Sequence, residues 1–355
     1  MGKAPIFQNI ALGPRENIVS KSIEKQANPK LTGYLSELNN LLISTEVEAI
    51  SHAPATPRHP VVFVAGVPRS GVTLVMQWLA ASGLFSYPSN LIARFYKAPY
   101  LGARIQRMLT DPELAVRGEV PLPGTTSDDF FISELGQTRG LFAPNSFYSF
   151  WDHIFGITQK NEFAIGKDKT IDVAYLRSEL AAFESVLDRP LAFHAVKLYR
   201  RLNYLKHILP NVIILYVTRK PLYNMQSLYE ARLKQSGKAT AWFSWKIPEY
   251  NDLSGLSPYK QVAGQFHYMR SEMERQLADI PLAHYIPIEY ETFCKSPERT
   301  WTELNKSFNH FGFTLHRDYT GPRQFVVHNR KRLDKVVLQR LAAAYFALSG
   351  KKISL

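Results

Sequence analysis

Short apolar runs alternate with stretches of helical periodicity over most of the chain. Four of the apolar runs are short and rich in β-branched or aliphatic residues, which predicts strands. They are residues 61–67 (VVFVAGV), 189–198 (RPLAFHAVKL), 211–220 (NVIILYVTRK) and 284–290 (HYIPIEY). Helical spacing of apolar residues is found in residues 73–83, 222–235 and 296–313. Strands and helices are therefore expected to alternate along the body of the chain.

The predicted helices carry boundary signals of their own. Gly83 follows the first of them and is a plausible helix stop, Pro221 opens the second, and Ser-Pro-Glu at residues 296–298 opens the third. Strands that alternate with helices predict an α/β fold with a mostly parallel central sheet. In such folds, ligands bind near the carboxyl ends of the strands.

Residues 1–58 are expected to form an extension in front of this body. Apolar residues recur at helical spacing in residues 31–50 (LTGYLSELNNLLISTEVEAI), which predicts an amphipathic helix packed on the body. The proline-rich stretch at residues 51–60 (SHAPATPRHP) then predicts a linker.

Residues 95–175 are aromatic, loop-rich and show neither the helix nor the strand period. Such an insertion in an α/β enzyme is a natural lid or acceptor-binding wall, and irregular packing explains the pattern equally well. We place the main domain at residues 59–320, with this insertion inside it. Residues 321–355 are expected to form a basic C-terminal segment followed by a helix.

Composition and charge narrow the class of partner. The 355 residues are 45% hydrophobic and 12% aromatic, as in a globular protein with a core. Lys and Arg number 43 against 30 Asp and Glu, so the net charge of +13 favours an anionic partner. The densest basic run is HNRKRLDK, and no zinc-finger spacing, RNA-binding aromatic signature or polybasic arm is found. A polyanionic nucleotide is therefore preferred over nucleic acid.

The sequence also limits location and redox chemistry. No run approaches the roughly 20 apolar residues that span a bilayer, and the first ten residues lack the apolar core of a secretory signal. Gly2 is present, but the sixth residue is neither Ser nor Thr, which argues against myristoylation. We expect a cytoplasmic protein, with peripheral membrane contact left open. Cys294 is the only cysteine, so an intrachain disulfide is excluded and a small buried side chain is expected.

The first candidate site is the turn VPRSGVTL, which follows the first predicted strand. Gly66, Gly71 and Thr73 have the spacing of a phosphate-binding loop, in which backbone N–H groups at a helix start form an anion cradle. Val72 stands where a nucleoside triphosphatase has its lysine, whereas Arg69 offers a guanidinium inside the loop. Because no carboxylate for magnesium ends another strand, ATP hydrolysis is disfavoured, and a plain structural turn remains the alternative.

A second candidate site begins where the strand at residues 211–220 ends. Arg219 lies at that strand end, and Ser227 lies two turns into the helix that Pro221 opens. The two side chains could converge on a further anionic group. Taken alone, Arg219 is more simply a cation at a strand end, and Ser227 is more simply a hydroxyl on a helix face.

Together, the two segments resemble the sulfotransferases that use 3′-phosphoadenosine 5′-phosphosulfate (PAPS). PRSGVTL resembles the PRSGTTL loop of that family, and YVTRKPLYNMQSLYEAR resembles its 3′-phosphate segment. The resemblance implies a three-layer, P-loop-like α/β/α fold and assigns the 3′-phosphate to Arg219 and Ser227. It assigns the 5′-phosphosulfate to Arg69, Ser70, Gly71, the backbone of Val72, Thr73 and Leu74. It also implies no metal ion.

The resemblance extends over roughly residues 60–315 and is more specific to a group of bacterial sulfotransferases. LIARFYKAPYLGARI, LYEARLKQSGKATAWFSWKIPE and QVAGQ are similar to segments of that group. Two departures stand out. Val72 replaces a threonine and removes one hydroxyl from the loop, and Pro-Asn-Ser at residues 144–146 replaces a common Pro-His-Glu.

The implied reaction is an in-line transfer of a sulfuryl group from PAPS to a hydroxyl or amine, with adenosine 3′,5′-bisphosphate as product. It needs a group that takes the acceptor proton. His194 stands where many members have a lysine, with Lys197 three residues later, and Glu134 matches a position that is often acidic. Any of the three is a candidate catalytic residue, and a core histidine is the alternative for His194. His153 is more simply a packing residue.

Two charged segments, the acceptor and the class of activity each have more than one interpretation. Asp128 and Asp129 have the pattern of a solvated turn, and the run Arg330, Lys331 and Arg332 either folds over the nucleotide or is a solvated charge run. The acceptor is expected to be a carbohydrate, a glycolipid or a small natural product. The alternatives are a degenerate P-loop kinase of a nucleotide or sugar, and a non-catalytic nucleotide-binding protein.

Overall fold

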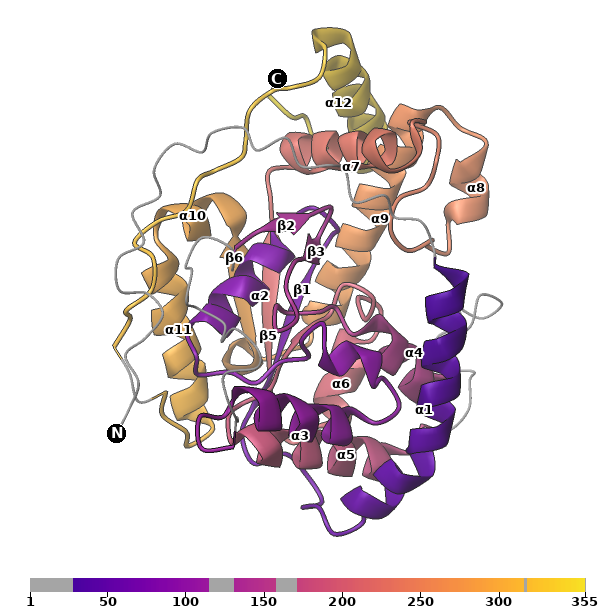
Figure 1. Cartoon of the computed structure of the whole chain (residues 1–355). Helices are drawn as coiled ribbons and strands as arrows, with labels where there is room; N and C mark the ends of the chain where they lie inside the picture. The colour runs from indigo at the N-terminus through magenta and orange to yellow at the C-terminus, as the bar shows by residue number, and fades with distance from the viewer. Residues whose placement is uncertain (1–27, 115–130, 158–170, 316–317, 355) are drawn as a thin grey trace.

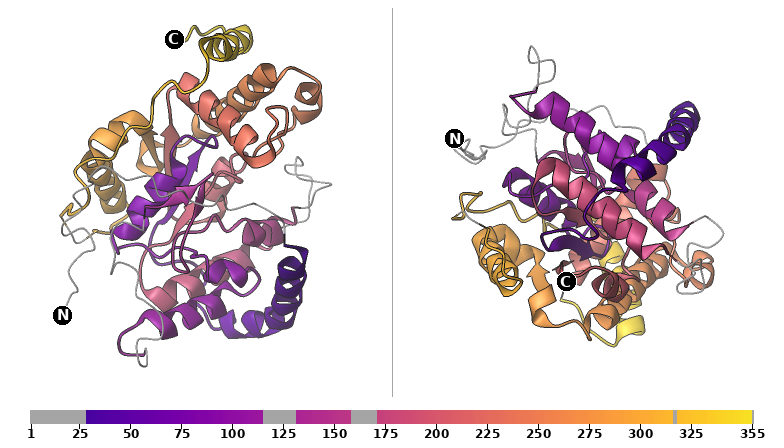
Figure 2. Two further views of the ribbon diagram at one scale, coloured as in Figure 1. Left: turned by 45° about the horizontal axis from the view of Figure 1, so that its top comes forward. Right: turned by 90° about the horizontal axis from the view of Figure 1, so that it is seen from below.

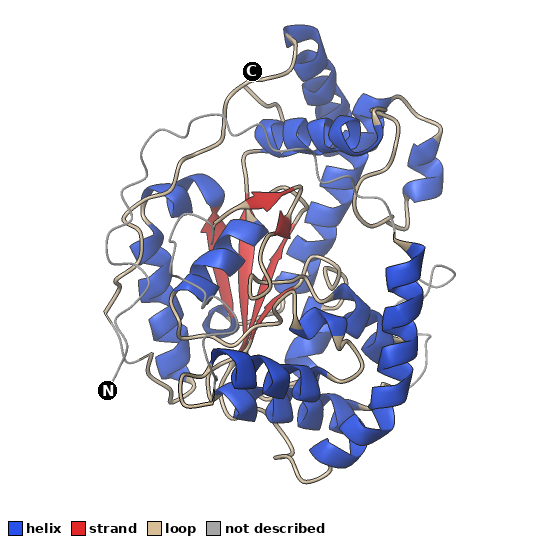
Figure 3. Ribbon diagram, viewed as in Figure 1, coloured by secondary structure: helices blue, strands red, loops and turns tan. Residues whose placement is uncertain are grey.

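A four-stranded parallel sheet forms the centre of the computed structural model (Figures 1 and 3). The structure describes residues 28–114, 131–157, 171–315 and 318–354, so Gly2, Asp128 and Asp129 lie outside the described residues. The strands follow the order β4-β1-β5-β6. Their bounds are β1 Val61–Gly66, β4 Ala192–His194, β5 Val212–Thr218 and β6 Tyr285–Glu289. The predicted parallel sheet is confirmed.

The two central strands are buried on both faces, which explains their unbroken apolar sequences. In β1, Val61, Phe63 and Ala65 pack into one hydrophobic cluster, and Val62 and Val64 pack into another on the opposite face. The first cluster also contains side chains of α5, α6, α7, α9 and α12, and the second contains side chains of α2, α10 and α11. The architecture is therefore the predicted three-layer α/β/α fold.

The helices of the two layers have the following bounds. One layer consists of α2 Val72–Ala81, α10 Tyr290–Lys295 and α11 Pro297–His310. The other contains α5 Val173–Leu187, α6 Leu202–Ile208, α7 Pro221–Ser236, α9 Pro258–Leu277 and α12 Lys335–Ser349. The short α8 Tyr250–Ser254 precedes α9. Three of these helices match the predicted ones, and Gly83 beyond α2 has a left-handed φ of +68°, as a helix stop requires.

Residues 95–175, in which no regular period was found, contain more helix and strand than their sequence indicated. They include α3 Pro99–Thr110, α4 Tyr148–Phe155 and a two-stranded hairpin of β2 Ser133–Glu134 and β3 Gln137–Thr138. Leu135 and Gly136 form the hairpin turn with φ values of +50° and +85°, the two positive angles of a tight hairpin turn. Helix α3 buries Pro99, Gly102 and Ala103.

The predicted N-terminal helix is confirmed as α1 Pro29–Ile50, and it packs on the body across α3 and α5 (Figure 2, right). Polar side chains fix its position. The buried Glu46 accepts hydrogen bonds from the backbone N–H groups of Tyr100 at 2.6 Å and Leu101 at 3.1 Å, at the start of α3. Among the described residues, no helix is long and apolar enough to cross a membrane.

A second carboxyl group lies beside Glu46 in this interface. Glu179 of α5 is fully buried and accepts a hydrogen bond from the Tyr175 hydroxyl at 2.9 Å. Burial raises the pKa of Glu179 well above its ordinary value, helped by the charge of Glu46, and burial also raises the pKa of Glu46. We infer that the pair shares a proton, since two like charges are unfavourable in contact.

Replacing Glu179 with Gln is expected to stabilise the fold at alkaline pH. A glutamine can accept from Tyr175 and donate to Glu46, but it carries no charge. A raised pKa makes the folded state bind more protons than the unfolded state, so the native pair loses stability as the pH rises above 4.5, the ordinary value. We expect Glu179→Gln to raise the free energy of unfolding by about 1–3 kcal/mol at about pH 8.5, and by little near pH 5. Urea denaturation at both pH values measures the difference, and an equal gain at both would contradict the shared proton.

Candidate active site

The turn between β1 and α2 lies at the carboxyl edge of the sheet and depends on two glycines. A Cβ atom on Gly66 would lie 2.5 Å from the carbonyl oxygen of Val217 in β5. Gly71 has a φ of +110°, and a Cβ atom there would lie 2.5 Å from the Tyr290 ring. The backbone N–H groups of the first turn of α2 have no acceptor within the helix, so the turn can bind an anion.

Val72 has a packing role in this turn. It is the first residue of α2, its side chain is only 4% exposed, and it belongs to the hydrophobic cluster on the α2 side of the sheet. One of its methyl carbons lies 2.9 Å from the place that a Cβ atom on Gly66 would occupy. Packing beneath the turn thus accounts for an apolar side chain where related loops have a threonine.

Two cationic side chains meet at the turn. Arg69 has a left-handed φ of +74°, and its Nε donates to the Ser227 hydroxyl of α7 at 3.1 Å. Arg219, at the end of β5, donates to the carbonyl oxygen of Arg69 at 3.1 Å. Burial, and then the charge of Arg219, lowers the pKa of Arg69 to about 10, and burial lowers the pKa of Arg219. Both groups therefore stay charged at neutral pH.

The segment after α11 crosses the same edge of the sheet. Arg219 donates to the side-chain oxygen of Asn329 at 2.9 Å and to the carbonyl oxygen of His328 at 2.5 Å. Gln226 of α7 donates to the carbonyl oxygen of Arg330 at 2.8 Å and accepts from the N–H of Arg332 at 2.9 Å. The basic segment is thus held over the start of α7.

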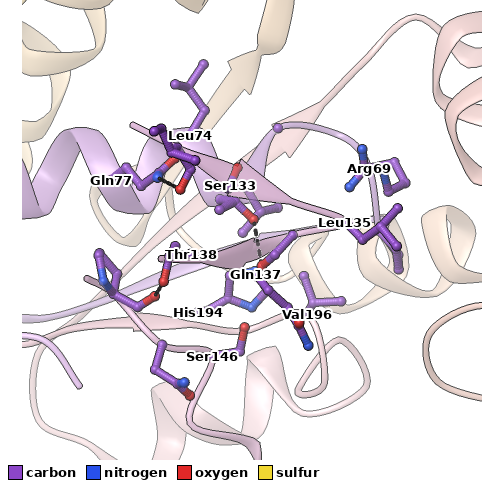
Figure 4. Close-up of a pocket in the computed structure, with 18 of the residues that line it drawn as sticks. Arg69, Leu74, Gln77, Ser133, Leu135, Gln137, Thr138, Ser146, His194 and Val196 are labelled. Carbon is purple, nitrogen blue, oxygen red and sulfur yellow. Dashed lines mark hydrogen bonds between the residues drawn. The ribbon is translucent and has the colours of Figure 1, made fainter. Parts of the chain in front are cut away.

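A cavity of about 1870 Å³ opens beside these groups, and Figure 4 shows part of its lining. Most of the predicted nucleotide-binding residues line it, namely Arg69, Gly71, Val72, Thr73, Leu74, Arg219 and Ser227. Ser70 does not. Its hydroxyl is buried without a hydrogen-bond partner among the described residues, and lies 2.5 Å from the Cβ position of Gly66. Arg330 and Arg332 also line the cavity, whereas Lys331 does not.

His194 lies at the end of β4 and lines the same cavity, near Gln137 and Ser146 (Figure 4). The side chain is 8% exposed, and its Nδ1 has no hydrogen-bond partner among the described residues. Burial lowers the pKa of His194 to about 4, so the imidazole is neutral at pH 7. A neutral imidazole in a cavity can accept a proton or a hydrogen bond.

The other candidate catalytic residues lie outside the cavity lining. Lys197 forms an ion pair with Asp152 of α4, and its ammonium lies 3.8 Å from the centre of the Trp245 ring. Glu134 is paired with Lys234 at 2.5 Å and with Arg139 at 3.8 Å. The structure therefore brings His194, but neither Lys197 nor Glu134, to the cavity that contains Arg69. His153 also lies outside the lining, and burial lowers its pKa.

The hairpin of β2 and β3 covers the start of α2. Thr73 donates from its hydroxyl to the carbonyl oxygen of Gly136 at 3.5 Å, and Gln77 donates to the carbonyl oxygen of Ile132 at 3.3 Å. Hairpin residues thereby form a wall of the cavity, and this contact had no signal in the sequence.

A buried polar network positions a second wall, which includes Trp242 and Trp245. Arg232 of α7 donates to the side-chain oxygens of Gln261 at 2.8 Å and Gln265 at 3.0 Å in α9. Gln265 donates in turn to the carbonyl oxygen of Phe243 at 2.8 Å, between the two tryptophans. The only sequence signal for this role was two glutamines four residues apart, within a segment singled out for its resemblance.

Replacing Gln265 with Met should weaken the fold by leaving Arg232 and the Phe243 carbonyl short of a partner. A buried polar group without its partner costs about 1–3 kcal/mol, which is the expected loss in the free energy of unfolding. Lys260→Met, on an exposed position of the same helix, is the matched control and should change stability by at most about 0.5 kcal/mol. Urea denaturation measures both variants, and an equal loss in the two would contradict the network's role.

The model of the sulfotransferase family matches residues 60–310. The fold is similar to that of sulfotransferase STF9 from Mycobacterium avium, at 15% identity and a TM-score of 0.53, over 90% of this chain and 84% of that one. Sulfotransferase STF1 from Mycobacterium tuberculosis is 13% identical, with a TM-score of 0.46, over 87% of this chain and 81% of that one. No curated protein matches the sequence. The similarity to STF9 confirms the fold that the resemblance implied.

Proposed function

The chain belongs to the sulfotransferase family, and on that premise we propose that it transfers the sulfuryl group of PAPS to a hydroxyl or amine of an acceptor. The acceptor is a carbohydrate, a glycolipid or a small natural product. Adenosine 3′,5′-bisphosphate is the second product. Membership of this family replaces the kinase alternative, and the absence of a lysine at Val72 agrees with that choice.

The observation that carries the proposal is the meeting of Arg69, Arg219 and Ser227 at one edge of one cavity. The N–H groups of the turn, together with Arg69, would hold the 5′-phosphosulfate. Arg219 and Ser227 would hold the 3′-phosphate. An anion between two guanidinium groups relieves their repulsion and forms charge-assisted hydrogen bonds, and the second phosphate gives the site its selectivity. Ser70 would shape the turn rather than contact the anion, because its hydroxyl is buried and its N–H donates to the carbonyl oxygen of Val67 at 3.0 Å.

The C-terminal segment supports the same nucleotide position. Arg330 and Arg332 line the cavity, and Arg332 is held by Glu230 of α7 at 2.5 Å. We propose residues 59–320 as the transfer domain and residues 321–355 as a basic segment that completes its nucleotide site. The helix α12 then anchors this segment, because Leu341 and Tyr345 belong to the hydrophobic cluster that includes α7 and α9.

His194 is our choice for the group that accepts the acceptor proton. It lines the cavity as a neutral imidazole, whereas Glu134 and Lys197 have ion-pair partners and lie outside the lining. PAPS would supply an activated sulfuryl group with a good leaving phosphate. The turn would stabilise charge on the departing 5′-phosphate oxygen, and the hairpin of β2 and β3 would help to exclude water.

Arg219→Ala is expected to abolish transfer without unfolding the protein. The protein is incubated with labelled PAPS and a cell extract, and labelled products are separated and identified. Loss of a charge-assisted contact to the 3′-phosphate should lower the rate at subsaturating PAPS about 100-fold. Lys295→Ala, which changes an exposed cation outside both the cavity lining and the C-terminal segment, should keep the wild-type rate. Equal rates for wild type and Arg219→Ala would place the nucleotide elsewhere.

The identity of the base is tested with His194→Gln and Glu134→Gln, using the acceptor labelled in that extract. We expect His194→Gln to lower kcat/KM by about 100-fold or more and Glu134→Gln to change it less than about threefold. Since burial lowers the pKa of His194 to about 4, the imidazole accepts protons at all higher pH values. The kcat/KM of the wild type should therefore stay constant from about pH 6 to 8. A fall in the wild-type kcat/KM with a midpoint near pH 6.5 would contradict this assignment. So would a His194→Gln variant with the wild-type kcat/KM.

A further inference from the structure

The buried face of α1 continues beyond the part of the body on which it docks. Leu38, Asn39, Leu42 and Glu46 follow helical spacing along that face and are buried or half-buried. The same face carries Leu35 and Leu31 toward the start of the helix. These two leucines line the large cavity, although they belong to the N-terminal extension.

Asn39 joins the middle of α1 to the segment before α3. Its side chain donates to the carbonyl oxygen of Arg94 at 2.8 Å and accepts from the N–H of Lys97 at 2.8 Å. It also donates to the carbonyl oxygen of Leu35 at 2.8 Å. Asn39 is fully buried, so these contacts fix the turn that carries Leu35 to the segment before α3.

A continuous lining connects this end of the cavity to His194. Ser146 and Asn145 lie on the wall that His194 faces, and Asn145 donates to the side-chain oxygen of Asn90 at 2.8 Å. The next residue, Leu91, donates from its N–H to the carbonyl oxygen of Leu141 at 2.9 Å. Leu141 and Ala93 then line the cavity with the two leucines of α1.

The two ends of the cavity differ in chemistry. The end at the sheet edge carries Arg69, Arg219 and His194. The end at α1 carries the aliphatic side chains of Leu31, Leu35, Ala93 and Leu141, with the exposed Arg94 at its margin. Leu31 is 40% exposed and Leu141 is 38% exposed, so apolar surface is left open there. A sugar or a small polar alcohol would leave this surface in contact with water, whereas an apolar chain would cover it.

We propose that the α1 end of the cavity binds an apolar chain of the acceptor, and that the acceptor is an alcohol with an alkyl chain. The assignment rests on the proposed sulfuryl transfer. The acceptor hydroxyl lies at His194, and the alkyl chain of the acceptor extends past Leu141 to Leu31 and Leu35. The acceptor oxygen bonds to sulfur as the bond from sulfur to the 5′-phosphate oxygen breaks, and the hydroxyl proton passes to His194. The N-terminal helix is then a specificity element.

The test measures how affinity depends on chain length. The full chain is first titrated with adenosine 3′,5′-bisphosphate, and then, with that nucleotide saturating, the dissociation constants of labelled 1-butanol, 1-hexanol and 1-octanol are measured by equilibrium dialysis. Each fully buried methylene group strengthens binding about fourfold, so the four additional methylene groups of octanol would give about 250-fold if all were buried. Because this end of the cavity is partly open, we expect octanol to bind at least about tenfold more tightly than butanol. Binding of the bisphosphate without this dependence overturns the apolar site and leaves the transfer function standing. Failure to bind the bisphosphate overturns the function itself.

Leu35→Gln assigns the effect to α1. The variant should reduce the preference for octanol over butanol at least about threefold, because a polar side chain replaces one wall of the apolar end. Leu41→Gln is the matched control, since Leu41 lies on the same helix, is 70% exposed and does not line the cavity. It should keep the wild-type preference.

A second variant guards against a loss of folding in the first. Leu35→Trp fills the end of the cavity, so it should weaken octanol binding at least about fivefold and leave butanol binding within about twofold. Thermal unfolding shows whether each variant is folded. Equal octanol-to-butanol ratios in wild type, Leu35→Trp and Leu41→Gln would overturn the role of α1.

Discussion

A hydrogen bond of 3.1 Å from the Arg219 guanidinium to the main-chain carbonyl of Arg69 joins the ends of β1 and β5. It holds Arg69 in a left-handed conformation, which costs a non-glycine residue about 1–2 kcal/mol. That conformation brings the Arg69 side chain to Ser227 on α7. Two guanidinium groups are thereby kept partly buried beside each other and beside the N–H groups of a helix start. The proposed nucleotide site depends on this contact, because it couples a phosphate-binding turn to a second anion site.

The fold could be predicted because its strands are short apolar runs between helices, and β1 and β5 are covered on both faces. The structure of the region between α2 and α5 was not predicted, for reasons local to that region. The hairpin of β2 and β3 has only two residues in each strand. The two-residue strands leave no period to detect, whereas α3 is twelve residues long and amphipathic, so its period was present in the sequence and was not recognised. The turn and Arg219 were found because they follow strands directly, and the carboxyl ends of parallel strands meet at one edge.

The catalytic candidates show what a sequence leaves undetermined. Glu134, Lys197 and His194 were equally plausible by residue type, but their partners lie far away in the chain. Lys234 pairs with Glu134 and Asp152 pairs with Lys197, and neither partner could be named from spacing. Among these three, His194 is distinguished by lining the cavity, and its buried Nδ1 has no hydrogen-bond partner among the described residues. Val72, unexplained by its motif, is explained by its packing beneath Gly66.

The walls of the cavity come from segments that are distant in the sequence, so the proposed nucleotide and acceptor sites share one continuous space. We propose that two phosphates of one nucleotide bind in this space, one at the turn and one at Arg219 and Ser227. Calorimetric titration of the unaltered protein with adenosine 3′,5′-bisphosphate and with adenosine 5′-monophosphate tests this claim most directly. Two charge-assisted contacts to the 3′-phosphate predict that the bisphosphate binds at least about 100-fold more tightly. Equal affinities for the two nucleotides would contradict it.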